Sequence, residues 1–159
     1  MATIDKYLRR LTRLERYAAN HDYQSVLELV KFWKINFCRL AKAYEKAGNI
    51  GCSQYALAIG ALFDTKSAYS LGVNYASGQV MSGIPDYEQS KYYMNLAMTG
   101  DETIKVKCCY WLAQFHFQSL ITGADYHIGK AFYDQAKELD PDGKIEKKVK
   151  RIINNILKK

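Results

Sequence analysis

The residue types that most often carry out chemistry are present in this chain but are not arranged for it. Three histidines, four cysteines and sixteen acidic residues occur among 159 residues. No metalloprotease, serine-hydrolase, phosphate-loop or dinucleotide-binding motif occurs. Glu15, Glu28, Glu45 and Glu88 fall on different expected helices, so they do not form a pair spaced for acid–base catalysis. We therefore predict that the chain is not an enzyme and uses no cofactor.

The histidines and cysteines have structural explanations. His21 falls in a turn before a helix, where we expect it to face solvent. His116 occupies the place that Tyr44 and Tyr75 hold in similar segments, so we expect it to pack. The cysteines match no zinc motif, and neighbouring side chains on a helix diverge by about 100°. We expect buried, reduced thiols that pack as small hydrophobic side chains, and no metal site. The cysteines are Cys38, Cys52, Cys108 and Cys109.

Positive charge is concentrated at the two ends of the chain. The net charge is +7, and residues 21–143 are slightly acidic while residues 1–20 and 144–159 are strongly basic. Basic ends of this kind are typical of segments that bind nucleic acid or an anionic surface. The basic tail consists of Lys144, Lys147, Lys148, Lys150, Arg151, Lys158 and Lys159.

The composition predicts an ordered domain without a membrane span. Hydrophobic residues make up 48% and charged residues 25% of the chain, which argues against disorder. No run of eighteen apolar residues occurs, and arginines interrupt the first twenty residues where a secretory signal would need an apolar block. We expect a cytoplasmic protein, with export that leaves no signal as the alternative.

A two-residue pattern, Asp or Asn followed by Tyr or Ile, recurs along the chain before segments that we expect to be helical. Asp22-Tyr23, Asn49-Ile50, Asp86-Tyr87 and Asp125-Tyr126 each precede an apolar stretch of helical period. The intervals between these openings are 27, 37 and 39 residues. Self-similarity at periods of roughly 20 to 50 residues is typical of arrays of small stacked units.

Helical periodicity covers nearly the whole chain and predicts an all-α fold of nine helices. We expect an array over residues 1–143, followed by a separate basic amphipathic helix over 144–159. The predicted helices cover residues 3–19, 22–33, 37–47, 51–63, 67–77, 86–99, 103–119, 125–139 and 144–158.

Four segments carry a resemblance to tetratricopeptide repeats and to their longer relatives, the Sel-like repeats. Residues 37–49 resemble a tetratricopeptide first helix and turn, and residues 68–78 resemble a Sel-like first helix. Residues 86–100 resemble the second Sel-like helix, and 109–136 are a weaker copy of the pair. The resemblance is clear over 37–141 and implies a right-handed stack of helical hairpins.

The sequence departs from the repeat pattern at small-residue positions. Ala41 and Ala113 stand where a glycine is usual, and Ser90 and Gly129 stand where an alanine is usual. Gly72, beside Leu71, keeps the expected small residue, which would let a neighbouring helix approach closely.

The resemblance also implies a binding surface. First helices of such arrays line a concave groove that holds a segment of a partner protein. Because the expected groove is apolar and basic, we expect a helical or extended partner segment that carries acidic residues. Val73 and Gln114 stand where the family's carboxylate clamp would have asparagine, so a chaperone's acidic tail is not implied. The predicted groove residues are Cys38, Lys42, Glu45, Lys66, Tyr69, Val73, Lys107, Tyr110, Gln114 and Phe117.

The last helix allows two interpretations. Its apolar stripe could cover the last repeat as a cap, with the basic residues in solvent. Alternatively the helix could lie on nucleic acid or an anionic membrane. The sequence favours a protein-interaction module, such as an adaptor, scaffold or dedicated chaperone, over nucleic-acid or anionic-surface binding through the basic ends. The stripe consists of Ile145, Val149, Ile152, Ile153, Ile156 and Leu157.

Overall fold

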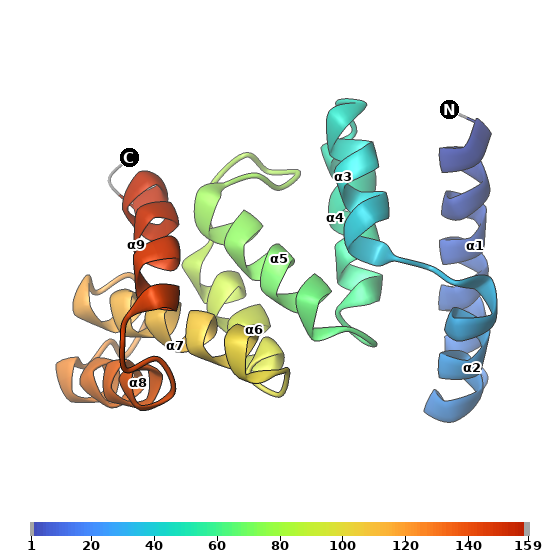
Figure 1. Ribbon diagram of the computed structural model, residues 1–159. Helices are drawn as coiled ribbons and strands as arrows, with labels where there is room; N and C mark the ends of the chain where they lie inside the picture. The colour runs from blue at the N-terminus through green and yellow to red at the C-terminus, as the bar shows by residue number, and fades with distance from the viewer. Residues whose placement is uncertain (1, 158–159) are drawn as a thin grey trace.

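A computed structural model describes residues 2–157, with side chains from Lys6 onward. Within this range the chain forms nine α-helices and no strand, so the all-α prediction is confirmed (Figure 1). The helices are α1 (Ala2–Ala18), α2 (Tyr23–Trp33), α3 (Phe37–Lys46), α4 (Ile50–Gly60), α5 (Thr65–Ser77), α6 (Tyr87–Ala97), α7 (Glu102–Phe117), α8 (Tyr126–Leu139) and α9 (Lys144–Leu157).

Side-chain caps fix where most of these helices begin. An Asp or Asn oxygen accepts a hydrogen bond from a first-turn amide at the starts of α2 to α8, which satisfies donors that have no partner within the helix. The first residue of each recurring two-residue pattern is confirmed as a helix N-cap. These residues are Asp22, Asn49, Asp86 and Asp125. The boundary before α3, which no Gly or Pro marks, is set by Lys34 at φ 51° and by Asn36, which caps α3.

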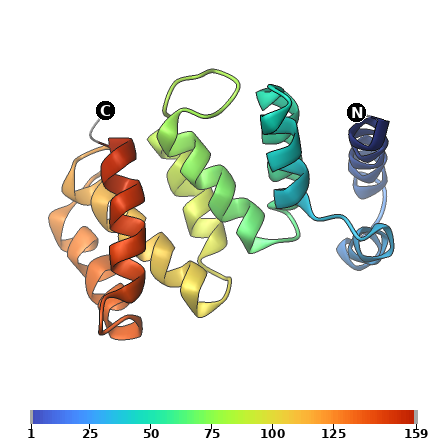
Figure 2. The same cartoon turned by 45° about the horizontal axis from the view of Figure 1, so that its top comes forward.

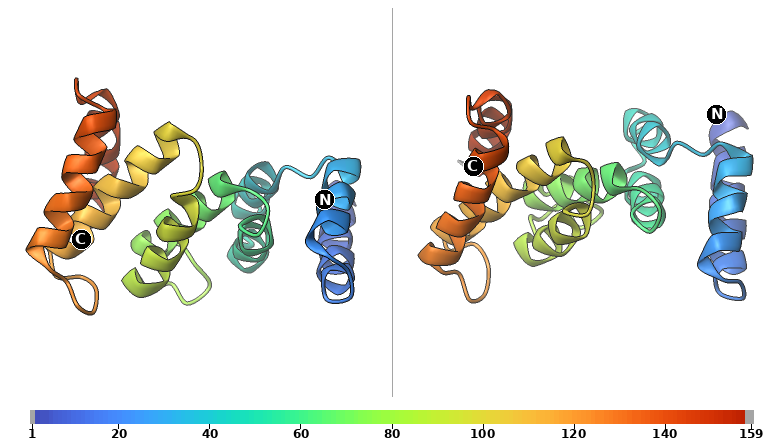
Figure 3. Two further views of the ribbon diagram at one scale, coloured as in Figure 1. Left: turned by 90° about the horizontal axis from the view of Figure 1, so that it is seen from below. Right: turned by 60° about the horizontal axis from the view of Figure 1, so that its bottom comes forward.

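Consecutive helices pack in pairs, and the pairs follow one another along the molecule. The pairs are α1 with α2, α3 with α4, α5 with α6, and α7 with α8. Among the described residues, each pair contacts only the pair before and the pair after it in the chain (Figure 2). The exception is α9, which packs against α7 and α5. As a result, α1 and α2 lie at one end of an elongated molecule and α8 and α9 at the other (Figure 3).

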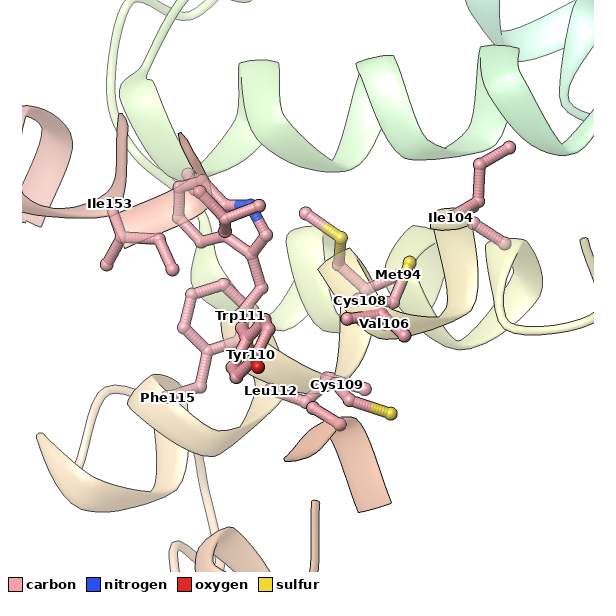
Figure 4. Close-up of a cluster of buried hydrophobic side chains, with 14 of the residues drawn as sticks. Met94, Ile104, Val106, Cys108, Cys109, Tyr110, Trp111, Leu112, Phe115 and Ile153 are labelled. Atoms are coloured by element: carbon pink, nitrogen blue, oxygen red, sulfur yellow. The ribbon is translucent and has the colours of Figure 1, made fainter. Parts of the chain in front are cut away.

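The hydrophobic core is divided into two clusters that meet at α5. The N-terminal cluster joins α1 to α4 and includes Leu11, Phe37 and Leu71. The C-terminal cluster is built around α7, whose Trp111 and Phe115 are fully buried because α5, α6, α8 and α9 all pack around this helix. Figure 4 shows part of this second cluster, which also contains Ile153 of α9.

A glycine lies at the close contact of α5 with α6. A β-carbon at Gly72 would lie 3.2 Å from Met94 Cε, and the Gly72 carbonyl accepts a 2.6 Å hydrogen bond from the buried Ser90 hydroxyl. Gly72 is thus in direct contact with the Met94 side chain of the neighbouring helix, which is consistent with the role predicted for this small residue. Ser90, one of the departures from the repeat pattern, adds a polar link between the two helices.

No helix within residues 2–157 combines the length and the apolar character that crossing a bilayer requires.

Candidate functional site

Two adjoining hollows lie over α3, α5 and the start of α7. One, of about 210 Å³, is lined by α3, α4 and α5 and by Ile152 of α9. The other, of about 330 Å³, is lined by α3, α5 and α7. Both hollows share Cys38, Lys42, Tyr69 and Ser70, so we describe them together as the open groove.

The structure brings seven of the ten predicted groove residues together in the open groove. They come from the first helices of three successive pairs, as the repeat spacing implied. These residues are Cys38, Lys42, Glu45, Lys66, Tyr69, Val73 and Lys107.

The charges in the open groove are unbalanced. In the described part of the chain, Lys42, Lys66 and Lys107 form no ion pair. The two carboxylates of the groove already have donors: Glu45 accepts from Gln79 Nε2 at 2.6 Å, and Asp101 accepts from the Ile104 amide at 2.9 Å. The groove therefore presents three amines and two carboxylates that form no ion pair with one another, which leaves a small excess of positive charge.

Tyr69 forms a fixed apolar surface among these amines. Its hydroxyl accepts a 3.1 Å hydrogen bond from the Trp111 indole nitrogen, which ties α5 to α7. Burial raises the pKa of Tyr69 to about 12, so the hydroxyl stays protonated. The Lys107 ammonium lies 5.7 Å from the centre of the Tyr69 ring, within the range of a cation–π interaction. The arrangement can hold an apolar side chain over the ring and carboxylates at the amines.

The structure does not bring the other three predicted residues into the open groove. Tyr110 is only 5% exposed, and with Gln114 it faces a small separate hollow bounded by α9. Phe117 packs at the contact of α7 with α8, with its ring centre 5.3 Å from that of Tyr126. For Tyr110 and Gln114 the physical reason is that α9 folds back over the α7 part of the surface, whereas Phe117 is taken up by the packing of α7 on α8. We describe this covered part, with Tyr110, Gln114 and α9, as the closed region.

Asp140 anchors α9 in the closed region. It is buried, and its carboxylate accepts hydrogen bonds from the Tyr110 hydroxyl at 2.9 Å and from the amides of Ile145 and Glu146 at 3.1 and 2.9 Å. The sequence pattern assigns no separate role to Asp140, which directly follows the helix predicted over 125–139. Its position shortly before the first turn of a helix was the signal that could have indicated a cap.

Glu146 provides a second anchor. It accepts from the Tyr133 hydroxyl at 2.7 Å and from the Lys137 ammonium at 3.0 Å, both on α8. Burial acts to raise the pKa of Glu146, but the Tyr133 and Lys137 hydrogen bonds, together with the charges of Lys137 and Lys150, lower it overall. For Asp140 burial also acts to raise the pKa, and the bonds from Glu146, Ile145 and Tyr110 lower it overall. Both groups are therefore held as carboxylates.

The described residues of the predicted basic tail are exposed on α9, and one of them, Lys150, also lines the hollow of the closed region. The stripe residues Val149 and Ile153 are buried, while Ile152 is 44% exposed at the wall of the open groove. Lys144 pairs with Asp142 at 3.7 Å. Lys158 and Lys159 lie outside the described residues. The exposed basic residues of α9 are Lys144, Lys147, Lys148, Lys150 and Arg151.

His21 and His116 lie as predicted, but of the cysteines only Cys108 and Cys109 are buried, because Cys38 and Cys52 are on helix faces that stay partly exposed. His21 is exposed, and His116 is buried, with Nδ1 accepting from the Asp125 amide at 3.1 Å. The cysteines are free thiols, and burial raises the pKa of Cys108 to about 12, so this thiol stays protonated. Among the described residues no group of three or more His, Cys, Asp or Glu side chains is placed to hold a metal ion.

Comparison of the chain with protein-family models, with curated proteins and with solved structures found no significant match.

Proposed function

We propose that the chain is an α-solenoid of the tetratricopeptide or Sel-like type, a right-handed stack of helical hairpins that works as a protein-interaction module. The pairing of consecutive helices, and the contact of each pair with its neighbours, support this architecture. The close approach at Gly72 supports it further, because this glycine lies in the segment that resembles a Sel-like first helix.

The open groove binds a segment of a partner protein that carries both acidic and apolar side chains. The observation that carries this proposal is the fixed ring of Tyr69 beside three lysines without acidic partners. Carboxylates of the partner would pair with Lys42, Lys66 and Lys107, and an apolar side chain would cover Tyr69 and Val73. The chain would then act as an adaptor, scaffold or dedicated chaperone, by binding and without covalent chemistry.

Photo-crosslinking tests the location of this contact. A photoreactive amino acid is placed at Ser70, within the groove, and in a second protein at Tyr92, which is 59% exposed on α6. Crosslinking in nuclease-treated lysate is followed by mass spectrometry to identify the captured segment. We expect captured acidic segments from position 70 only. Equal capture from both positions would contradict the proposal.

Binding of the captured segment as a synthetic peptide then tests the charge argument. We expect the Lys66→Glu, Lys107→Glu double variant to lose at least tenfold in affinity, measured by calorimetry, because two attractive contacts become repulsive. Lys148→Glu, a charge reversal on the outer side of α9, is the matched control and should bind as the unmodified protein does. Unchanged affinity in the double variant would reject the groove as the binding site.

The alternative function expected from the basic ends is nucleic-acid or anionic-surface binding. The two basic helices α1 and α9 lie at opposite ends of the molecule, so they do not form one continuous surface. Any such activity would therefore belong to one end only. The basic residues of α1, which line a hollow together with Trp33, favour the N-terminal end.

A further inference from the structure

The first helix carries a positively charged surface remote from the open groove. A hollow of about 640 Å³ lies against α1 and is closed on one side by the indole of Trp33 from α2. Four arginines and a lysine provide its charge, and we name them the arginine face. The arginine face consists of Lys6, Arg9, Arg10, Arg13 and Arg16.

Helical spacing places these residues on the side of α1 that faces solvent. Leu11 and Leu14 on the opposite side are buried in the N-terminal cluster, at 0% and 1% exposure. With a rise of about 1.5 Å per residue, the row from Lys6 to Arg16 is about 15 Å long. The arginine face is therefore a linear row of cations, and Arg9 and Arg13 lie one turn apart within it.

Among the residues from Lys6 onward, whose side chains the structure describes, acidic side chains do not pair with this row. Glu15 is the only acidic residue between Lys6 and Arg16, and its carboxylate accepts a hydrogen bond from the Tyr55 hydroxyl on α4. Among residues with described side chains, no member of the arginine face forms an ion pair. Five like charges within about 15 Å repel one another, and a bound polyanion would relieve that repulsion.

Aromatic rings next to the row add a second feature. The Arg10 guanidinium lies 5.4 Å from the ring centre of Tyr7 and 6.0 Å from that of Trp33. These cation–π contacts hold Arg10 at the edge of the hollow. The hollow thus combines guanidinium groups, which bind phosphate through two parallel hydrogen bonds, with a flat indole surface on which a base can stack.

We propose that the arginine face binds the phosphate backbone of single-stranded nucleic acid, without sequence preference. A linear row of guanidinium groups matches a linear chain of phosphates. An anionic membrane is the competing occupant, because Phe32, next to Trp33 in the sequence, is 80% exposed, and the experiment therefore includes anionic vesicles. The site is independent of the open groove, so either can fail while the other holds.

Salt-dependent binding of a labelled oligonucleotide tests this proposal. Fluorescence anisotropy of a fluorescein-labelled twelve-residue oligothymidylate is recorded over a range of salt concentrations for the full-length chain. Each phosphate contact on a single strand contributes about 0.7 to the slope of log affinity against log salt. We therefore expect Arg13→Gln with Arg16→Gln to lower the magnitude of the slope by about 1.4, and to weaken binding at low salt at least tenfold.

A matched double variant on α9 controls for total charge. Lys147→Gln with Lys148→Gln removes the same two charges at the opposite end, and we expect its slope to equal that of the unmodified protein. Because Arg13 and Arg16 are exposed, both double variants should melt at the same temperature; Arg9→Gln with Arg13→Gln is the second choice if they do not. An unchanged slope in the α1 variant, an equal effect of the α9 variant, or tighter binding to duplex DNA or anionic vesicles would overturn the proposal.

Discussion

The open groove and the closed region belong to the same surface of the molecule, yet they differ in whether their polar groups have partners. In the open groove, Lys42 and Lys66 are exposed and form no ion pair among the described residues. In the closed region, the Tyr110 and Tyr133 hydroxyls both bond to carboxylates that α9 and the loop before it supply.

The difference shows how one added helix converts a binding surface into an interior. Where α9 covers α7, the tyrosine Tyr110 is 5% exposed and its hydrogen-bonding capacity is used within the chain. On the part of the surface that α9 does not cover, Tyr69 is half-buried and its ring lines the open groove. The same residue type therefore supports folding in one region and is available for binding in the other.

The largest expected effect comes from the residue that links the two regions. Trp111 is fully buried in the C-terminal cluster and bonds to Tyr69 in the open groove. We expect Trp111→Ala to lower the free energy of unfolding by about 3–5 kcal/mol, because it removes a large buried side chain and leaves a cavity. Urea unfolding followed by circular dichroism measures this loss.

Trp33 provides the matched control for Trp111. It is half-buried on α2, where it lines the hollow beside α1, and it does not belong to the C-terminal cluster. We expect Trp33→Ala to have a clearly smaller effect on unfolding. Equal losses for the two tryptophans would show that the closed region is no more tightly packed than the N-terminal end.

A slightly smaller effect is expected from the anchor of α9. Asp140→Ala removes the acceptor of the Tyr110 hydroxyl and of two amides that begin α9. Buried donors without an acceptor are costly, so we expect a loss of about 2–3 kcal/mol in the free energy of unfolding. In this variant, amide hydrogen exchange should become faster in α9 than in the unmodified protein, whereas exchange in α3 should not change. Asp142→Ala, at an exposed carboxylate in the same loop, should leave the urea midpoint unchanged.

The helices and the open groove could be predicted because local features determine them. Asp22 and Asp86 cap helices through contacts three residues away, and the apolar period follows from the same short segments. Cys38 lies two residues before the buried Leu40, and Tyr69 lies two residues before the buried Leu71, so the helical period alone predicts that both face the same side.

The position of α9 could not be predicted in the same way. Its stripe, with Val149 and Ile153, shows that one face must be covered but not which helix covers it. That choice depends on the long-range contacts with α7 and α5, and on the bond between Tyr110 and Asp140, thirty residues apart. As a result, Tyr110, Gln114 and Phe117 were grouped with the open groove by their spacing, whereas tertiary packing separates them from it.

As the pH falls, we expect the packing of α9 in the closed region to be destabilised at a higher pH than the helices that line the open groove. The pKa values of Asp140 and Glu146 are lowered in the folded protein, so the unfolded chain binds protons more readily than the folded chain does. Their stabilising contribution is complete above the unfolded values near 4 and is lost as pH falls through the folded values.

The fluorescence of Trp111 can follow this loss. In a Trp33→Phe protein, Trp111 is the single remaining tryptophan, and we expect its emission to shift to longer wavelength below about pH 4. The same protein with Asp140→Asn should show a smaller change in melting temperature between pH 7 and pH 3, because one of the two titrating groups is gone. Equal acid sensitivity of the two proteins would contradict this role of Asp140.

The smallest expected change in the free energy of unfolding comes from removing one polar group in each region. Tyr133→Phe removes only the hydroxyl that bonds to Glu146, and we expect a loss of about 1 kcal/mol in the free energy of unfolding. Lys66→Gln removes a charge in the open groove that has no ion pair among the described residues, so the urea midpoint should not change. Binding of the captured acidic peptide should respond in the opposite order, with Lys66→Gln weakening it and Tyr133→Phe leaving it unaffected. If Lys66→Gln destabilised the fold while peptide binding stayed constant, the amines of the open groove would be structural and the distinction between the two regions would not hold.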